Sequence, residues 1–352
     1  ARVEQGARHA RGLAGARRGL EHDAPAAAER ADDLRQDGID GQGREAHARG
    51  VRETLAARAG SRTIAPVRLA ENVPLAPRTT LGVGGPARRL IEAEREADVL
   101  DAVRELDARG EPLLVLGGGS NLLVGDEGFG GTVVRMATRG VEVERDGARA
   151  LVTAAAGEVW DELVTFAVGE GLAGVECLAG IPGLVGAVPM QNVGAYGQDV
   201  SQTIVRLRAW DRAAGEVVTI AREDCGFAYR SSVFRGRDRH VILDVTFALE
   251  PSETGRPIRY AELSRALGVD EGGAAPLSLV RETVVALRRK KGMVLDPADP
   301  DTASAGSFFT NPILDAGAVA ALRARVAAAL GADAAIPTFP EPDGRTKVSA
   351  AW

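Results

Sequence analysis

Apolar residues recur along this chain with two different periods, and each period predicts a different kind of element. Spacings of three and four place Val99, Val103 and Leu106 on one face of a predicted helix over residues 94–110. Further helices are predicted over residues 158–171, 277–291 and 315–330. Alternating or short apolar runs predict strands over residues 112–116, 132–136, 141–145, 150–156, 203–211, 215–221 and 240–250. Because no regular strand–helix–strand repeat joins these elements, they predict an α+β fold.

The first 62 residues have a different composition from the rest. They are rich in Ala, Arg, Gly, Asp and Glu, hold three of the four histidines, and contain no aromatic residue. A segment of this kind buries little apolar surface. We therefore predict a disordered or non-native extension over residues 1–62, with order beginning near Asn72.

Composition and charge exclude several classes of protein. The chain is 45% hydrophobic and 26% charged, with a net charge of -6 and both signs interspersed, so neither nucleic acid nor a membrane is expected as a partner. The two cysteines, Cys177 and Cys225, make no disulfide framework, and no Cys/His cluster indicates a metal. No apolar run is long enough to cross a bilayer, and the N-terminus lacks the apolar region of a signal peptide. We expect a cytoplasmic protein.

A first glycine-rich segment, "LGGGSN", directly follows the predicted strand over residues 112–116. Glycines allow the backbone to approach a ligand closely and to turn its N–H groups toward an anion. The side chains of two neighbouring residues add hydrogen-bonding groups. A plain turn after a strand explains three glycines equally well. The residues concerned are Gly117, Gly118, Gly119, Ser120 and Asn121.

A second glycine-rich segment, "GIPGLVGAVPMQNVGAYG", spans residues 180–197 and is largely apolar. A solvated linker would be more polar, so the pattern favours a buried, tightly turned loop against a large flat ligand. An earlier segment, "GVGGPA" over residues 82–87, matches the dinucleotide fingerprint only in its letters. No predicted strand precedes it, and Pro86 stands where the following helix should run. A dinucleotide can bind this chain, but not on a Rossmann unit.

Together with "CGFAYRSSVF" (residues 225–234) and "SAGSFFTNP" (residues 304–312), these segments resemble, in sequence and in order, the UDP-N-acetylenolpyruvoylglucosamine reductase (UDP-N-acetylmuramate dehydrogenase) family. The family comprises FAD enzymes of peptidoglycan precursor synthesis. The resemblance implies a vanillyl-alcohol-oxidase-like (PCMH-type) FAD-binding fold in two subdomains, followed by a C-terminal α+β substrate domain. We expect these at residues 63–140, at residues 141–295 with a substrate-clamping insertion, and at residues 296–352.

The resemblance also implies which residues contact FAD. The first glycine-rich segment, residues 117–121, matches the family's pyrophosphate loop. Many flavoproteins of the wider superfamily attach FAD through a histidine, but residues 48–239 contain none, so noncovalent FAD is expected. The residues that match the second flavin-contacting loop are Pro182, Gly183, Gly186, Gln191, Asn192 and Gly194.

The family's reaction gives a role to Ser307, a serine with no histidine near it in the sequence. NADPH reduces the flavin, a hydride passes to the vinyl carbon of an enolpyruvyl ether, and a proton must reach the adjacent carbon. A serine that donates a proton to a basic enolate needs only position, whereas a nucleophilic serine needs a base. By its match to the family Ser307 is this donor, and Arg230 is the catalytic arginine beside the substrate carboxylate. Taken alone, Ser307 is typical of a turn and Arg230 of a surface.

The UDP half of the substrate implies further contacts. Tyr229 is expected to shape the pocket. "RYAEL" and "RRKKGMVLDP" resemble the subclass with an extra clamping segment, in which Tyr260 matches a stacking tyrosine and Lys291 a diphosphate lysine. A one-residue slip in the alignment would give that role to Lys290. Asn311 matches a substrate-binding asparagine. Without the resemblance, the lysines are typical of a solvated helix end.

Two departures from the family leave alternatives open. Thr310 stands where relatives often carry a lysine, so one phosphate or NADPH contact is expected to differ. The family's catalytic glutamate lies beyond the position that Trp352 matches, so the chain is expected to be truncated and to lack that residue. The alternatives are another noncovalent FAD oxidase of the superfamily, which would use oxygen, and a catalytically inactive FAD-binding fragment. We expect a monomer.

Overall fold

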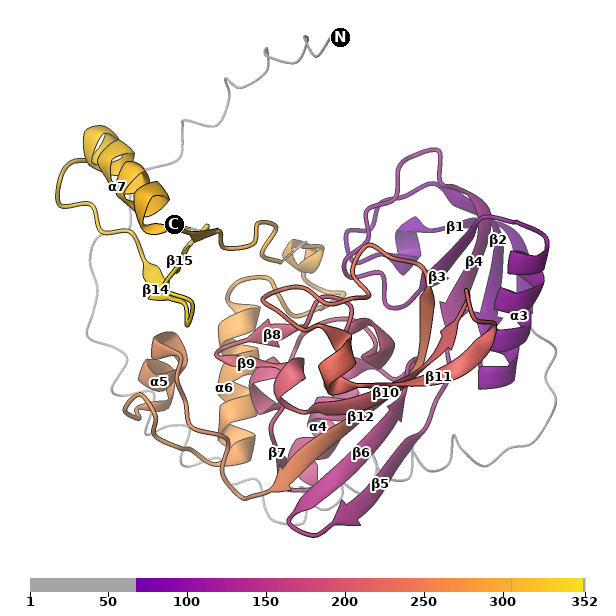
Figure 1. Cartoon of the computed structure of the whole chain (residues 1–352), viewed down its shortest axis with the longest axis horizontal. Helices are drawn as coiled ribbons and strands as arrows, with labels where there is room; N and C mark the ends of the chain where they lie inside the picture. The colour runs from indigo at the N-terminus through magenta and orange to yellow at the C-terminus, as the bar shows by residue number, and fades with distance from the viewer. Residues whose placement is uncertain (1–67, 305, 351) are drawn as a thin grey trace. The chain divides into compact units, whose positions relative to one another are not determined.

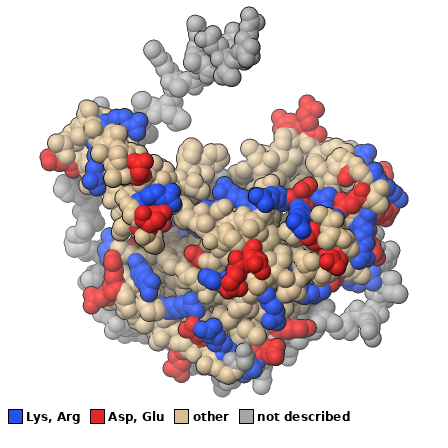
Figure 2. Space-filling view, viewed as in Figure 1, with Lys and Arg blue, Asp and Glu red and all other residues tan. Residues whose placement is uncertain are grey.

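The structure is a computed structural model that describes residues 68–304, 306–350 and 352. The prediction for residues 1–62 lies outside this range. All described residues belong to one compact unit. Basic and acidic side chains are interspersed over the face shown in Figure 2, in line with the mixed charge of the sequence. No helix in the described ranges has the length and apolarity needed to cross a bilayer.

The first sheet has four strands in the order β1-β2-β4-β3. β2 and β3 both run parallel to β4, and β1 runs antiparallel to β2. The helix α3 (Glu96–Ala108) connects β2 to β3, lies beside this sheet (Figure 1), and buries Val99, Val103 and Leu106 as predicted. The strands are β1 (Arg68–Pro74), β2 (Pro86–Ala93), β3 (Leu113–Leu116) and β4 (Phe129–Met136).

The second sheet is antiparallel, with the order β11-β10-β12-β6-β5, and β7 (Leu172–Ala173) pairs with the end of β12. Alternate residues of β6 are buried, as the period of two requires. β12 is the longest strand and is buried along most of its length. The strands are β5 (Val141–Asp146), β6 (Arg149–Ala155), β10 (Ile204–Asp211), β11 (Glu216–Ala221) and β12, the last spanning His240–Pro251.

Helices pack against this sheet, and the hydrophobic core lies between them and its strands. Trp160, the first residue of α4 (Trp160–Gly169), is fully buried, packs on Phe247 with ring centroids 5.7 Å apart, and donates 3.0 Å to the carbonyl oxygen of Leu178. A buried indole with its N–H satisfied stabilises a core through both area and hydrogen bonding. The helix α6 (Leu277–Arg289) packs on the short helix η2 (Glu176–Leu178) and on α4, and it follows α5 (Ala261–Leu267).

A third, small sheet lies in the last part of the chain. Its order is β13-β15-β14, from β13 (Ile313–Leu314), β14 (Thr338–Pro340) and β15 (Thr346–Val348). The helix α7 (Ala316–Leu330) begins after Asp315, whose carboxylate accepts from the backbone N–H of Ala318 at 2.8 Å. This is the N-cap interaction expected of an aspartate.

The predicted helices and strands are all present, with small differences in length. The described residues already form a strand from Arg68, four residues before Asn72, where order was predicted to begin. The sequence did not predict β1, β2, α5 or the third sheet.

Pro86 is the first residue of a strand, not of a helix, which confirms that residues 82–87 are not a dinucleotide fingerprint. The three sheets described above lie one in each of the three predicted segments, and the two-stranded sheet of β8 (Gly194–Ala195) and β9 (Gln198–Asp199) lies in the second. The boundaries of the segments remain predictions. Short elements complete the chain: η1 (Ala76–Arg78), η2 (Glu176–Leu178), η3 (Val185–Ala187), η4 (Val200–Gln202), η5 (Arg222–Cys225) and η6 (Pro300–Thr302).

Candidate active site

The two glycine-rich segments touch each other through their backbones. A Cβ at Gly118 would lie 2.9 Å from the Cα of Gly183, closer than real Cβ atoms approach. Gly119 adopts a φ of 64°, and a Cβ there would meet the carbonyl oxygen of Arg78. Only glycine allows contacts this close. Residues distant in the sequence therefore form one continuous backbone surface.

Side chains reinforce this contact. Ser120 Oγ donates 3.1 Å to the carbonyl oxygen of Pro182. Asn121 Nδ2 donates 3.4 Å to Gln191 Oε1. Four of the residues predicted to contact FAD are thus paired across the two segments. These bonds use side chains and a carbonyl oxygen, and they do not use the backbone N–H groups of the neighbouring glycines.

The second segment is also held by the end of β6. The backbone N–H of Gly186 donates 2.9 Å to the carbonyl oxygen of Ala156, and that of Val185 donates 2.9 Å to Glu158. A Cβ at Gly186 would lie 2.6 Å from the Cβ of Ala156. The prediction of a tightly turned loop is confirmed; Val185 is fully buried, and most other residues of the segment are half-buried.

A buried carboxylate stands shortly before the second segment and bonds to the residue directly after it. Glu176, fully buried, accepts from the backbone N–H groups of Gly174 (2.6 Å) and Arg256 (2.8 Å) and from Nε2 of Gln198 (2.8 Å). Gln198 Oε1 in turn accepts from the N–H of Cys177. A carboxylate with several donors is stable without a cation. Glu176 was not among the residues predicted from the sequence.

A cavity of about 270 Å³ opens beside the two segments, between β3 and the beginning of β12. It is lined by Gly117 and Gly186, by apolar side chains such as Val115 and Ile242, and by the polar side chain of His240. Burial lowers the pKa of His240, which keeps its imidazole neutral near pH 7. Pockets for drug-sized ligands measure about 300–1,000 Å³. The cavity therefore suits one half of a dinucleotide, and glycine backbone with an apolar slot fits FAD.

Arg230 stands at the opposite end of the second segment. Its guanidinium donates to the carbonyl oxygens of Gly194 and, at 3.3 Å, of Asn192. Asn192 is buried, donates 3.1 Å from Nδ2 to the carbonyl oxygen of Ala228, and accepts from the N–H of Ser201. Arg230 and Asn192 both have left-handed backbones, with φ of 51° and 47°. Strain of this kind is often found at functional sites.

Tyr229 connects this arginine with the third sheet. Its hydroxyl accepts from the backbone N–H of Asn311 at 3.4 Å. The Cζ of Arg230 lies 5.4 Å from the ring centroid of Tyr229, and Nζ of Lys347 lies 4.8 Å from it. Lys347 also pairs with Glu341 at 2.7 Å. Three predicted site residues, Tyr229, Arg230 and Asn311, are therefore neighbours, and Lys347 is a cation that the sequence analysis missed.

Tyr260 and Lys291 belong to a second group of contacts. The rings of Tyr260 and Tyr196 meet edge to face at 5.4 Å, and Nζ of Lys291 lies 5.7 Å from the Tyr196 ring centroid. Lys291 also pairs with Glu262 at 2.8 Å. Lys290, the alternative in the alignment, has no side-chain partner within the described part of the chain. Tyr196 has a φ of 48° and was also missed, although it lies within the quoted "GAYG".

Ser307 is exposed in a segment where Phe308 and Phe309 are 76% and 71% exposed. Among the described residues, no hydrogen bond joins Ser307 to Arg230 or to another predicted site residue. Its proton-donor role therefore remains a prediction. Thr310, where the family often has lysine, is exposed in the same segment.

Comparison with known proteins identifies the family. A family model described as an FAD binding domain matches residues 87–221, and this range contains both glycine-rich segments. The match confirms the predicted FAD cofactor and the α+β flavoprotein fold. The UDP-N-acetylenolpyruvoylglucosamine reductase of Thermobifida fusca is 56% identical over 284 residues, 80% of this chain and 80% of that protein. Its Streptomyces avermitilis counterpart is 55% identical over 294 residues, 83% of this chain and 80% of that protein. A solved UDP-N-acetylenolpyruvylglucosamine reductase from Thermus caldophilus has a TM-score of 0.49 and 28% identity, covering 70% of this chain and 75% of that chain. At this identity and coverage, the chain belongs to the UDP-N-acetylenolpyruvoylglucosamine reductase family.

Proposed function

We propose that this protein reduces UDP-N-acetylenolpyruvoylglucosamine to UDP-N-acetylmuramate in peptidoglycan precursor synthesis, with NADPH as reductant and noncovalent FAD between them. The observation that carries the proposal is the attachment of Arg230 to the end of the second glycine-rich segment. Relatives of the same name support the substrate. A nucleotide-sugar substrate and NADPH are consistent with a cytoplasmic enzyme, and we propose that it acts as a monomer.

FAD, when bound, supplies transfer of a hydride from NADPH to the terminal vinyl carbon of the substrate. Two segments would hold it: residues 117–121 at its diphosphate, and the second segment along its length. Backbone N–H groups of glycine-rich loops bind anionic oxygens well because no side chain keeps the anion at a distance. Within the second segment, Asn192 and Gly194 would lie nearest the reacting end, because Arg230 contacts both.

Arg230 is proposed to bind the substrate carboxylate. Hydride addition to the vinyl group places negative charge next to this carboxylate, so a fixed cation stabilises the product of that step more than the substrate. The carbonyl oxygens of Asn192 and Gly194 hold the guanidinium in place before substrate arrives. A group positioned in advance stabilises charge without the cost of reorganising.

Ser307 is proposed to complete the addition by giving its hydroxyl proton to the carbon adjacent to the vinyl terminus. The resulting serine alkoxide must regain a proton from solvent. Ser307 is exposed, and its hydroxyl makes no hydrogen bond with the described residues that would compete with this role. Gly306, the residue before it, has a φ of 63°. Movement of the segment toward Arg230 when substrate binds is part of the proposal.

The UDP half of the substrate is proposed to bind along the two groups of contacts already described. Lys291 would contact the diphosphate and Tyr260 the uridine side, and Tyr196 lies beside both. Tyr229 and Asn311 would contact the sugar side, next to Lys347. The pairing of Lys291 with Glu262 leaves a cation that can exchange its partner for phosphate.

The experiment is a separation of the two half-reactions. Purified full chain is reduced with NADPH, and flavin reoxidation is followed at its visible absorption after addition of either the enolpyruvyl substrate or air. Faster reoxidation by the substrate than by oxygen is expected. Rapid reoxidation by oxygen, with no acceleration by the substrate, would instead assign the chain to the oxidases of the superfamily.

A further inference from the structure

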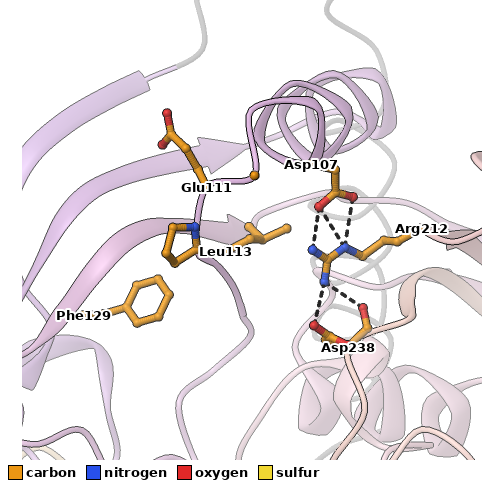
Figure 3. A pocket seen from close by; sticks show the side chains of 8 residues that line it. Asp107, Glu111, Leu113, Phe129, Arg212 and Asp238 are labelled. Carbon is orange, nitrogen blue, oxygen red and sulfur yellow. Dashed lines mark hydrogen bonds and ion pairs between the residues drawn. The ribbon is translucent and has the colours of Figure 1, made fainter.

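Arg212 stands between two cavities. It lines the 270 Å³ cavity beside the glycine-rich segments, and it also lines a second cavity of about 420 Å³ on its other side. Leu113 and Asp238 are likewise common to both, whereas Asp107 lines only the second. Figure 3 shows the Arg212 guanidinium between the Asp107 and Asp238 carboxylates. We call the cavity of about 270 Å³ the inner cavity and that of about 420 Å³ the outer cavity. Arg212, Leu113 and Asp238 are therefore part of the wall between them.

Every nitrogen of the Arg212 guanidinium has a partner. Nε donates to Asp107 at 3.0 Å and Nη2 at 2.5 Å, a bidentate arrangement. Nη1 donates 2.9 Å to the carbonyl oxygen of Asp238 and lies 3.2 Å from its carboxylate. The side chains of Arg212 and Asp107 are only 19% and 26% exposed. Bidentate, half-buried pairs of this kind are stronger and geometrically more specific than exposed ones.

The partners come from different parts of the fold. Asp107 lies in the last turn of α3, beside the first sheet, and Asp238 lies just before β12 of the second sheet. The backbone N–H of Arg212 also donates 2.9 Å to the carbonyl oxygen of Arg239. Arg212 thus holds together two elements whose separation would open the inner cavity toward the outer one.

The order of contacts along the second segment indicates which half of FAD would occupy the inner cavity. Gly186 and Met190 line the cavity, and Asn192 and Gly194, farther along, hold Arg230. The reacting flavin ring belongs next to Arg230 under the proposed function. The other half of the cofactor, adenosine, then extends into the inner cavity, where Arg212 closes the wall.

We propose that Arg212 is a positioning residue that keeps this wall closed through Asp107 and Asp238, and that it thereby sets the affinity for the adenosine half of FAD. The inference rests on the proposed function for the presence and orientation of FAD. It adds a determinant of cofactor specificity in a residue outside both glycine-rich segments.

The chain offers a matched control in Arg208. This residue lies in β10, which ends at the residue before Arg212, and it also joins α3 to the second sheet, through Glu96 at 2.7 Å and Asp244 at 2.7 Å. Its side chain is 41% exposed and lines neither cavity. Loss of Arg208 removes a similar bridge without opening the wall.

The experiment measures flavin affinity in Arg212→Gln, Arg212→Lys, Asp107→Asn and Arg208→Gln full-length proteins after removal of bound flavin. Dissociation constants for FAD and for FMN come from quenching of flavin fluorescence, and melting temperatures are measured without flavin. Because FMN lacks adenosine, we expect Arg212→Gln and Asp107→Asn to weaken FAD about tenfold and leave FMN unchanged. Arg212→Lys should recover part of the loss. Arg208→Gln should lower the melting temperature without changing the FAD-to-FMN ratio.

Three results would overturn the inference. Unchanged dissociation constants for both FAD and FMN in Arg212→Gln would show that the wall does not act on adenosine. Equal weakening of both flavins would assign Arg212 to the flavin half or to folding. A loss in the Arg212 variants without one in Asp107→Asn would mean that Arg212 contacts FAD directly and is not a positioning residue. If the unaltered protein binds neither FAD nor FMN, the proposed function itself is wrong, which separates that failure from the other three.

Discussion

The guanidinium of Arg230 donates to the carbonyl oxygen of Gly194 and so joins the loop after β11 to the end of the second glycine-rich segment. A Cβ at Gly194 would lie 2.9 Å from Nη1 of Arg230 and 2.8 Å from the backbone carbonyl oxygen of Gln198, and this second contact is the one that requires glycine here. A cation held by neutral carbonyl oxygens keeps its full charge for a ligand carboxylate, whereas a cation paired with a protein carboxylate would not. No carboxylate of the described residues pairs with Arg230, so the proposed catalytic arginine is already positioned and keeps its charge for the substrate.

The contact between the glycine-rich segments predicts a loss of FAD in Gly118→Val. The added side chain cannot fit against Gly183, so the two backbones must separate and the diphosphate surface is lost. We expect protein that purifies without yellow colour. Gly130→Val is the control, because a Cβ at Gly130, in β4, meets nothing within 4 Å. Full FAD occupancy in Gly118→Val, by the absorption of released flavin, would contradict the prediction.

The proton-donor role predicts that Ser307→Ala separates the half-reactions. Reduction of the flavin by NADPH should remain nearly unchanged, while reoxidation by the enolpyruvyl substrate should slow by about 10²-fold or more. Stopped-flow absorbance measures both rates. Ser304→Ala is a control in the same segment, since the Ser304 hydroxyl only accepts from the N–H of Gly306. Equal slowing of both half-reactions would remove Ser307 from the chemistry.

Elements with a regular pattern could be predicted from the sequence, because burial on one face imposes a period. Val99, Val103 and Leu106 predicted α3 in this way. β1 escaped prediction, since Asn72 interrupts its alternation with a φ of 50°. β13 and β15, of two and three residues, are too short to show a period.

The site could be predicted only in part. Runs of glycine mark places where backbones approach something, so Gly118 and Gly183 were identified, but not that they approach each other. Arg212 and Asp107 are 105 residues apart, and no local pattern indicates that pair. The identification of Ser307 depended entirely on the family resemblance. Its exposed position shows why physical reasoning from the sequence alone favoured a turn.

The two adjacent lysines predict a contrast in substrate affinity. Lys291 contacts Tyr196 and Glu262, next to Tyr260, so Lys291→Gln should raise KM for the UDP substrate about tenfold with little change in kcat. Lys290→Gln should leave both constants within about twofold, as expected for a surface substitution. Steady-state kinetics at saturating NADPH give both values. The reverse result would show that the family alignment slips by one residue here.

The turn between β10 and β11 predicts a specific acid dependence of stability. Asp211 is buried and accepts from the Arg239 guanidinium (2.6 Å) and from the N–H groups of Ala213 and Ala214, which hold its pKa well below the usual range. Because the folded-state pKa is lowered, the unfolded state binds the proton more readily. The stabilisation is therefore complete above the unfolded pKa of about 4 and is lost as pH falls below it.

Asp211→Asn removes this ionisation and tests the sign. At pH 7 the variant should have a lower free energy of unfolding than the unaltered protein, because an amide cannot accept the same charge-assisted bonds from Arg239. As pH falls below about 4, the unaltered protein should lose stability faster, so the difference between the two should narrow. Urea unfolding at pH 7, 5 and 3, with Asp343→Asn as an exposed carboxylate control also paired with an arginine, provides the measurement. A difference that stays constant over this range would mean that Asp211 contributes through its shape and hydrogen bonds alone, with no linkage to its charge.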